Sequence, residues 1–171
     1  MKRFFQGIAV GSFSLLLFVL DGQLSALLSH YLPGNLVMKS YFLFMLAIFL
    51  VAYVKIGFLL PLFLLLGVLY DSYFLQFLGL GLSLFPLAIF LMYHFYTDVA
   101  FPHTIRTLIL VVSIFSIEFV SYILARLFHV TSLSLFIFLA NQLLPTLLLN
   151  VFCFLLFHPL FDRLVGNINK T

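Results

Sequence analysis

The sequence consists of long apolar runs separated by single charged or polar residues, and this pattern leaves few folds open to it. Only 8% of the residues are charged, while 65% are hydrophobic. A soluble domain carries about 25% charged residues. A helix needs roughly 20 mostly apolar residues to cross a hydrocarbon core of about 30 Å. We therefore expect an all-α polytopic membrane protein.

Six transmembrane helices can be drawn by placing their ends at polar or turn-forming residues. The predicted spans are 4–28, 36–54, 56–70, 74–93, 107–127 and 133–157, and together they make residues 1–171 a single integral membrane domain. The third span is short, and it fits a bilayer only if Lys55 extends its ammonium group toward the lipid headgroups or the bilayer is locally thinned. The apolar run after Met1-Lys2-Arg3 is interpreted as a retained helix rather than a signal peptide, since comparable runs follow it.

The basic residues predict the orientation in the membrane. With the N-terminus in the cytoplasm, six spans also return the C-terminus there. Six basic residues then lie inside, namely Lys2, Arg3, Lys55, Arg106, Arg163 and Lys170. Lys39 and Arg126 lie outside, near span ends. This bias agrees with the positive-inside rule, so both termini are expected to be cytoplasmic.

Glu118 is the most unusual residue of this pattern. It is the twelfth residue of the span that starts at Thr107, near the middle of the membrane, where an ionised carboxylate costs about 2.5–3.5 kcal/mol. Its side chain must face the bundle interior, pair with another group or stay protonated. It either contacts an ion, proton or ligand, or fastens helices through hydrogen bonds. Asp21, in contrast, lies toward the end of the first span, where solvation is easy.

A second polar feature combines Asp71 with three glycines. Gly67 lies one helical turn before Asp71 and leaves room beside the carboxylate, while Gly79 and Gly81 permit close approach of the next span. One interpretation is a polar notch at a helix seam, open to a partner. The other is that Asp71 or Ser72 caps the fourth span while the glycines serve packing.

The sixth span contains Asn141, Pro145 and Asn150. Proline has no N–H to donate to the carbonyl of Asn141, four residues earlier, so a kink is expected. The freed carbonyl needs a partner, which Thr146 or an asparagine side chain can supply. This region either shapes a cavity or docking face, or it forms a kinked helix that is tied to its neighbours.

Other site types find little support in the sequence. His94, Asp98 and His103 fall in a loop around Pro102, without the spacing of a metal site, and Cys153 is the lone cysteine. No phosphate-binding, dinucleotide-binding or nucleophile-elbow motif occurs. The dispersed basic residues show no nucleic-acid signal. We expect no enzymatic activity, no metal and no cofactor.

The order of these motifs resembles the family of the rod shape-determining protein MreD. The resemblance extends over essentially the whole chain. The motifs that carry it are Gly67-x-x-x-Asp71, Leu78-Gly79, Glu118-Phe119 and the stretch Leu144-Pro145-Thr146-Leu147-Leu148-Leu149-Asn150. The resemblance implies a non-enzymatic scaffold subunit of the bacterial cell-shape and peptidoglycan elongation machinery, located in the plasma or inner membrane. It implies binding to the bitopic protein MreC, alongside MreB, RodA with its transpeptidase, and membrane lipid.

The resemblance also implies a fold similar to the S components of energy-coupling-factor transporters. The alternative function is therefore a small-molecule (vitamin) binding subunit of an uptake transporter. S components engage their transport module through Ala-x-x-x-Ala motifs in the first helix. The first span here offers Gly7-Ile8-Ala9-Val10-Gly11 instead, which counts against transport.

Overall fold

The computed structural model describes residues 2–32, 36–75, 79–95 and 103–170, and the regular structure of this part is entirely helical. The chain forms α1 (Lys2–Tyr31), α2 (Phe42–Tyr53), α3 (Ile56–Tyr70), α4 (Leu80–Phe95), α5 (His103–Leu127), α6 (Leu135–Phe138) and α7 (Leu144–Lys170). Two π-helical turns, η1 (Asp71–Leu75) and η2 (Leu139–Leu143), continue α3 and join α6 to α7. The all-helical class is thus confirmed.

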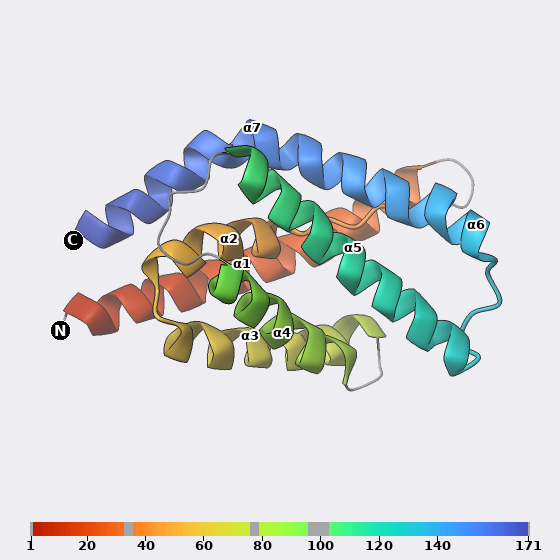
Figure 1. The fold of residues 1–171 in the computed structure, drawn as a ribbon, viewed down its shortest axis with the longest axis horizontal. Helices are drawn as coiled ribbons and strands as arrows, with labels where there is room; N and C mark the ends of the chain where they lie inside the picture. Colours follow the sequence, from red (N-terminus) through yellow and green to blue (C-terminus); the bar gives the residue numbers. More distant parts are fainter. Residues whose placement is uncertain (1, 33–35, 76–78, 96–102, 171) are drawn as a thin grey trace.

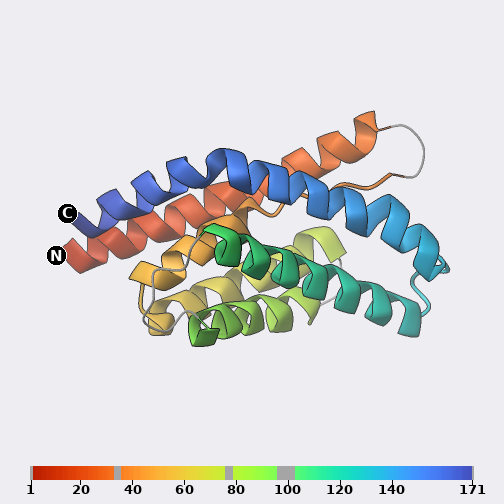
Figure 2. The same ribbon diagram turned by 45° about the horizontal axis from the view of Figure 1, so that its top comes forward.

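Within the part of the chain that the structure describes, four helical segments are long and apolar enough to cross a membrane. They are Gly7–Tyr31, Ile56–Tyr73, Thr104–Leu127 and Leu135–Leu160. The apolar parts of the two other helices are shorter, at Phe42–Ala52 in α2 and Leu80–His94 in α4. Figures 1 and 2 show that the chain begins and ends at the same end of the molecule.

The short helix α2 forms the centre of the bundle. Every side chain from Leu43 to Val51 is buried, and α2 contacts α1, α4, α5 and α7 (Figure 1). A helix that is apolar on all sides is stable only when other helices surround it. Phe44 of α2 meets the ring of Phe85 of α4 edge-on, with 4.9 Å between the centroids.

The start of the second predicted span differs from the structure. Residues 36–41, which were expected to be helical, form an extended segment, and the helix begins only at Phe42. The reason is that several N–H groups of this segment bond to groups on α1, η2 and α7 instead of to carbonyls of their own helix. This segment, called here the extended segment, builds the candidate site.

Candidate functional site

The extended segment is bound on one side to η2 and α7. The Val37 N–H donates to the carbonyl oxygen of Asn141 at 2.9 Å. Asn150 of α7 accepts from the Tyr41 N–H at 2.8 Å and donates from its Nδ2 to the Lys39 carbonyl at 2.7 Å. A side-chain amide can satisfy both kinds of backbone group at once. Asn150 therefore replaces part of the missing helical hydrogen bonding.

Pro145 explains why the Asn141 carbonyl is free to make this contact. The sequence predicted a freed carbonyl at Asn141, and the structure confirms that it finds a partner outside the helix. The expected partner, Thr146 or an asparagine side chain, was wrong: the donor is the backbone N–H of Val37. Thr146 is nonetheless near, because its Oγ1 accepts from the Lys39 N–H at 3.2 Å.

On its other side the extended segment is bound to α1. The Ser40 N–H donates to Ser25 Oγ at 2.9 Å, and the Ser40 hydroxyl donates to the Asp21 carbonyl at 3.1 Å. The Asp21 carboxylate accepts from the N–H groups of Phe42 and Leu43 at 2.8 and 2.9 Å. These are N–H groups of the first turn of α2, which have no partner inside that helix.

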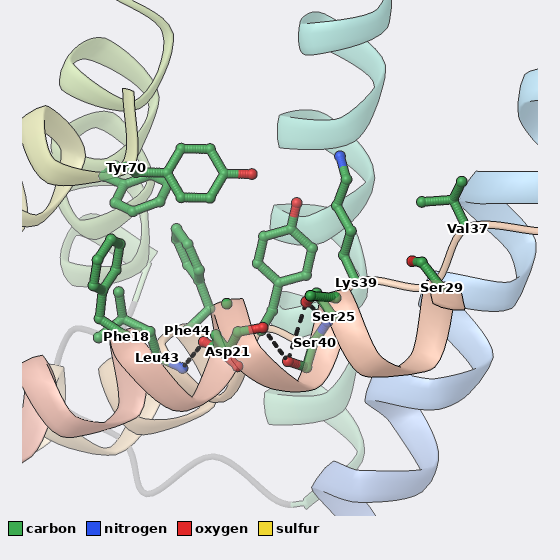
Figure 3. Close-up of a pocket in the computed structure, with 14 residues that line it drawn as sticks. Phe18, Asp21, Ser25, Ser29, Val37, Lys39, Ser40, Leu43, Phe44 and Tyr70 are labelled. Carbon is green, nitrogen blue, oxygen red and sulfur yellow. Dashed lines mark hydrogen bonds between the residues drawn. The ribbon is translucent and has the colours of Figure 1, made fainter. Parts of the chain in front are cut away.

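Asp21 thus caps a neighbouring helix from α1, a role that the sequence did not reveal. We expected Asp21 to be solvated at a span edge; instead its carboxylate sits at the start of α2, where a negative charge is stabilised. Figure 3 shows Asp21, Ser25 and Ser40 meeting in this way. Capping from another helix leaves no local signal in the sequence of α2.

Glu118 of α5 lies at the centre of the site and is 1% exposed. Its carboxylate forms an ion pair with Lys39 Nζ at 2.9 Å. It also accepts from the Tyr41 hydroxyl at 2.5 Å and from Gln142 Nε2 at 2.7 Å. As predicted, Glu118 faces the bundle interior and is paired.

Lys39 lies in the extended segment and not in a helix, which the predicted span 36–54 had implied. The extended segment carries it into the bundle, where its charge meets Glu118, and its side chain remains 28% exposed. The prediction failed because it treated residues 36–41 as helix. A useful signal was available: Glu118 required a partner inside the bundle, and a basic residue close to an apolar run is a candidate for it.

Asp71, the second candidate carboxylate, is fully buried at the joint between α3 and α4. Its oxygens accept from the N–H groups of Gly81 at 2.6 Å, Gly79 at 2.8 Å and Leu82 at 3.0 Å. Asp71 therefore caps the start of α4 from the preceding helix. This arrangement corresponds to the capping interpretation, and all three contacts lie within the chain.

The glycines near Asp71 allow two helix backbones to touch. A Cβ on Gly67 would lie 2.3 Å from the Gly81 oxygen, and one on Gly81 would lie 2.7 Å from the Gly67 oxygen. Gly79 serves differently, because its φ of +131° is one that other residues rarely adopt. Close packing through glycine is a common way to join membrane helices.

Two cavities lie on either side of the extended segment. The first, of about 270 Å³, lies between α1 and α2 and is lined by Asp21, Ser25, Lys39 and Tyr70 among others. In Figure 3 the Lys39 side chain points away from α1 toward the space that the Tyr70 hydroxyl enters. The second, of about 360 Å³, lies among the start of α4, the end of α5 and the α6–η2 segment. Lys39 lines both cavities.

Groups able to ligate a metal are scattered. Among the residues that the structure describes, no three His, Cys, Asp or Glu side chains come together as a metal site. Asp98, one of the loop residues considered from the sequence, lies outside the described part. The polar groups of the site are instead engaged with the backbone or with one another.

These features define an integral membrane protein whose buried carboxylates hold helices together. A comparison with known families gives the particular one: the model of the rod shape-determining protein MreD matches residues 3–168, so the chain belongs to the MreD family. It is 30% identical over 156 residues to the cell shape-determining protein MreD of Streptococcus pneumoniae (strain ATCC BAA-255 / R6), covering 90% of this chain and 94% of that protein. The resemblance seen in the sequence is confirmed. No solved structure matches the chain.

Proposed function

We propose that this protein is a non-enzymatic scaffold subunit of the peptidoglycan elongation machinery, and that it binds MreC and helps to regulate cell-wall synthesis and cell shape. Its membership of the MreD family carries the proposal. The site supports it, because the Asp21, Asp71 and Glu118 carboxylates all bind groups of the chain itself. MreB and RodA with its transpeptidase would join the same assembly. The six helical segments would all cross the bacterial cell membrane, with both termini cytoplasmic.

We place the partner surface elsewhere than at the α3–α4 joint, where Gly67 and Gly81 already approach each other closely. One exposed face of α1 combines apolar side chains with polar ones that can bind another helix. Its residues follow helical spacing and include two polar side chains within an otherwise apolar span; they are Ser12, Leu16, Val19, Gln23 and Leu27. We call this the α1 face. In lipid, polar side chains such as Ser and Gln favour contact with another helix through hydrogen bonds.

A comparable face on α7 has no such polar groups. Leu148, Phe152 and Leu155 are 71%, 66% and 59% exposed, and they follow the same helical spacing. A purely apolar face of this kind suits lipid, which is as apolar as leucine. The transmembrane helix of MreC is therefore proposed to pack on the α1 face and not on α7.

Co-purification of MreC with variants of this protein tests the proposal. The double variant Ser12→Phe/Gln23→Leu should reduce the recovered MreC about tenfold, a loss equivalent to about 1.4 kcal/mol. The matched variant Leu148→Phe/Phe152→Leu should leave recovery unchanged. Full recovery with the α1 variant, or loss only with the α7 variant, would place the partner on another surface. If no variant and no wild-type protein recovers MreC, the scaffold proposal itself is wrong.

A further inference from the structure

The cavity of about 360 Å³ among α4, α5 and the α6–η2 segment has the dimensions of a ligand site. Such sites span about 300–1,000 Å³ and combine apolar walls with a few polar groups. Here the walls include Phe128 and Phe138, and the polar groups include Ser121, Thr131 and Gln142. We call it the α4–α5–α6 cavity. The end of α5 and α6 lie at the end of the molecule opposite both termini (Figure 1).

The charged group accessible from this cavity is a cation. Lys39 lines the cavity and its side chain is 28% exposed, whereas the Glu118 side chain is 0% exposed. Glu118 is also compensated by the neutral donors Tyr41 and Gln142. The carboxylate thus does not depend on the ammonium alone. Lys39 has three N–H donors, so it can hold a further anion while it stays paired.

A second cation lies at the rim of the cavity. The Arg126 guanidinium donates to the Tyr122 hydroxyl and to the Leu133 carbonyl, each at 2.9 Å, and both of these residues line the cavity. No carboxylate is among the residues that line the cavity, and Arg126 forms no ion pair in the described part of the chain. The electrostatic potential of the cavity therefore favours an anion.

We propose that the α4–α5–α6 cavity binds an anionic amphiphile. Its phosphate or carboxylate group contacts Lys39, with hydroxyl groups such as those of Ser121 and Thr131 beside it, and its apolar part lies against Phe128 and Phe138. The amphiphile comes either from the membrane, as a lipid headgroup with part of its chain, or from solution, as a small phosphate ester. The inference is independent of the α1 face, and its test contains no MreC.

The test uses the purified full-length protein with three variants. Ser121→Phe fills the cavity from α5 and keeps both residues of the ion pair, and Thr131→Trp fills it from the α5–α6 connection. Ser116→Phe is the matched control, because Ser116 lies exposed on the same helix and does not line the cavity. Native mass spectrometry measures retention of phosphatidylglycerol against phosphatidylcholine. Thermal unfolding measures stabilisation by glycerol 3-phosphate.

If the amphiphile comes from the membrane, the protein should retain phosphatidylglycerol about tenfold more strongly than phosphatidylcholine, a difference equivalent to about 1.4 kcal/mol. The preference should vanish in Ser121→Phe and Thr131→Trp and persist in Ser116→Phe. A soluble source predicts stabilisation by glycerol 3-phosphate with the same pattern among the variants. If neither anion binds, or if binding survives both cavity-filling variants, the proposal is overturned.

Discussion

Lys39 and Glu118 lie 79 residues apart in the sequence, and their side chains form an ion pair of 2.9 Å inside an apolar helix bundle. The pair exists because residues 36–41 enter the bundle in an extended form. Two buried charges gain little net stability from each other, since both give up hydration. Removing Glu118, however, leaves the Lys39 ammonium without a counter-charge, whereas Glu118 without Lys39 keeps two neutral donors. The pair therefore specifies how the extended segment is positioned.

The pair can be tested by a double-mutant cycle. Glu118→Leu alone should destabilise the protein by about 3–5 kcal/mol, because it leaves the Lys39 ammonium without its counter-charge. Lys39→Met/Glu118→Leu should be less destabilised than Glu118→Leu alone. Thermal unfolding in detergent measures the stability of Lys39→Met, of Glu118→Leu and of the double variant. Additive effects of the two single changes would show that the charges act independently.

Asp71 should be essential to the start of α4. Asp71→Leu removes the acceptor of three backbone N–H groups. A buried group left without its hydrogen bond destabilises the protein by about 1–3 kcal/mol. Asp71→Asn keeps one acceptor oxygen and should lose less. The neighbouring change Ser72→Ala, at an exposed position, should stay within about 0.5 kcal/mol. Equal loss for Asp71→Leu and Ser72→Ala in thermal unfolding would contradict the capping role.

Gly67 and Gly57 lie in the same helix and should respond oppositely to alanine. A Cβ on Gly67 would meet the backbone of Gly81 at 2.3 Å, so Gly67→Ala should separate α3 from α4 and lower the melting temperature strongly. A Cβ on Gly57 meets nothing within 4 Å, and Gly57→Ala should be neutral or stabilise by about 0.5–1 kcal/mol. A tolerated Gly67→Ala would show that the two backbones do not touch.

Asn150 should control the protection of the extended segment. Asn150→Leu removes the acceptor of the Tyr41 N–H and the donor to the Lys39 carbonyl. Hydrogen exchange at residues 37–41 should therefore accelerate, while exchange in α5 stays slow. Asn150→Asp keeps the acceptor and should have a smaller effect. Unchanged exchange in Asn150→Leu would mean that other contacts hold the segment.

The helical class and the approximate limits of most helices were predictable because hydrophobic runs report them directly. The interior position of Glu118 and the freed carbonyl at Asn141 also follow from local chemistry: a carboxylate in lipid needs a partner, and proline lacks an N–H. Local chemistry thus shows what a residue requires, but not which distant residue supplies it.

The extended segment was not predictable in this way. Its apolar composition, Leu36-Val37-Met38, suits a helix, and its bonding partners lie in α1, η2 and α7. Asp21 was missed for the same reason, since it caps a helix that begins 21 residues later. Contacts of this range depend on tertiary packing, which overrides local propensity.

We propose that this protein acts as a binding subunit through the α1 face. Photo-crosslinking in living cells examines this contact itself, with a photoreactive residue placed at Ser12 on the α1 face or at Leu148 on α7. We expect a crosslink to MreC from Ser12 and none from Leu148. A crosslink from Leu148 with none from Ser12, or none from either position in folded protein, would contradict it.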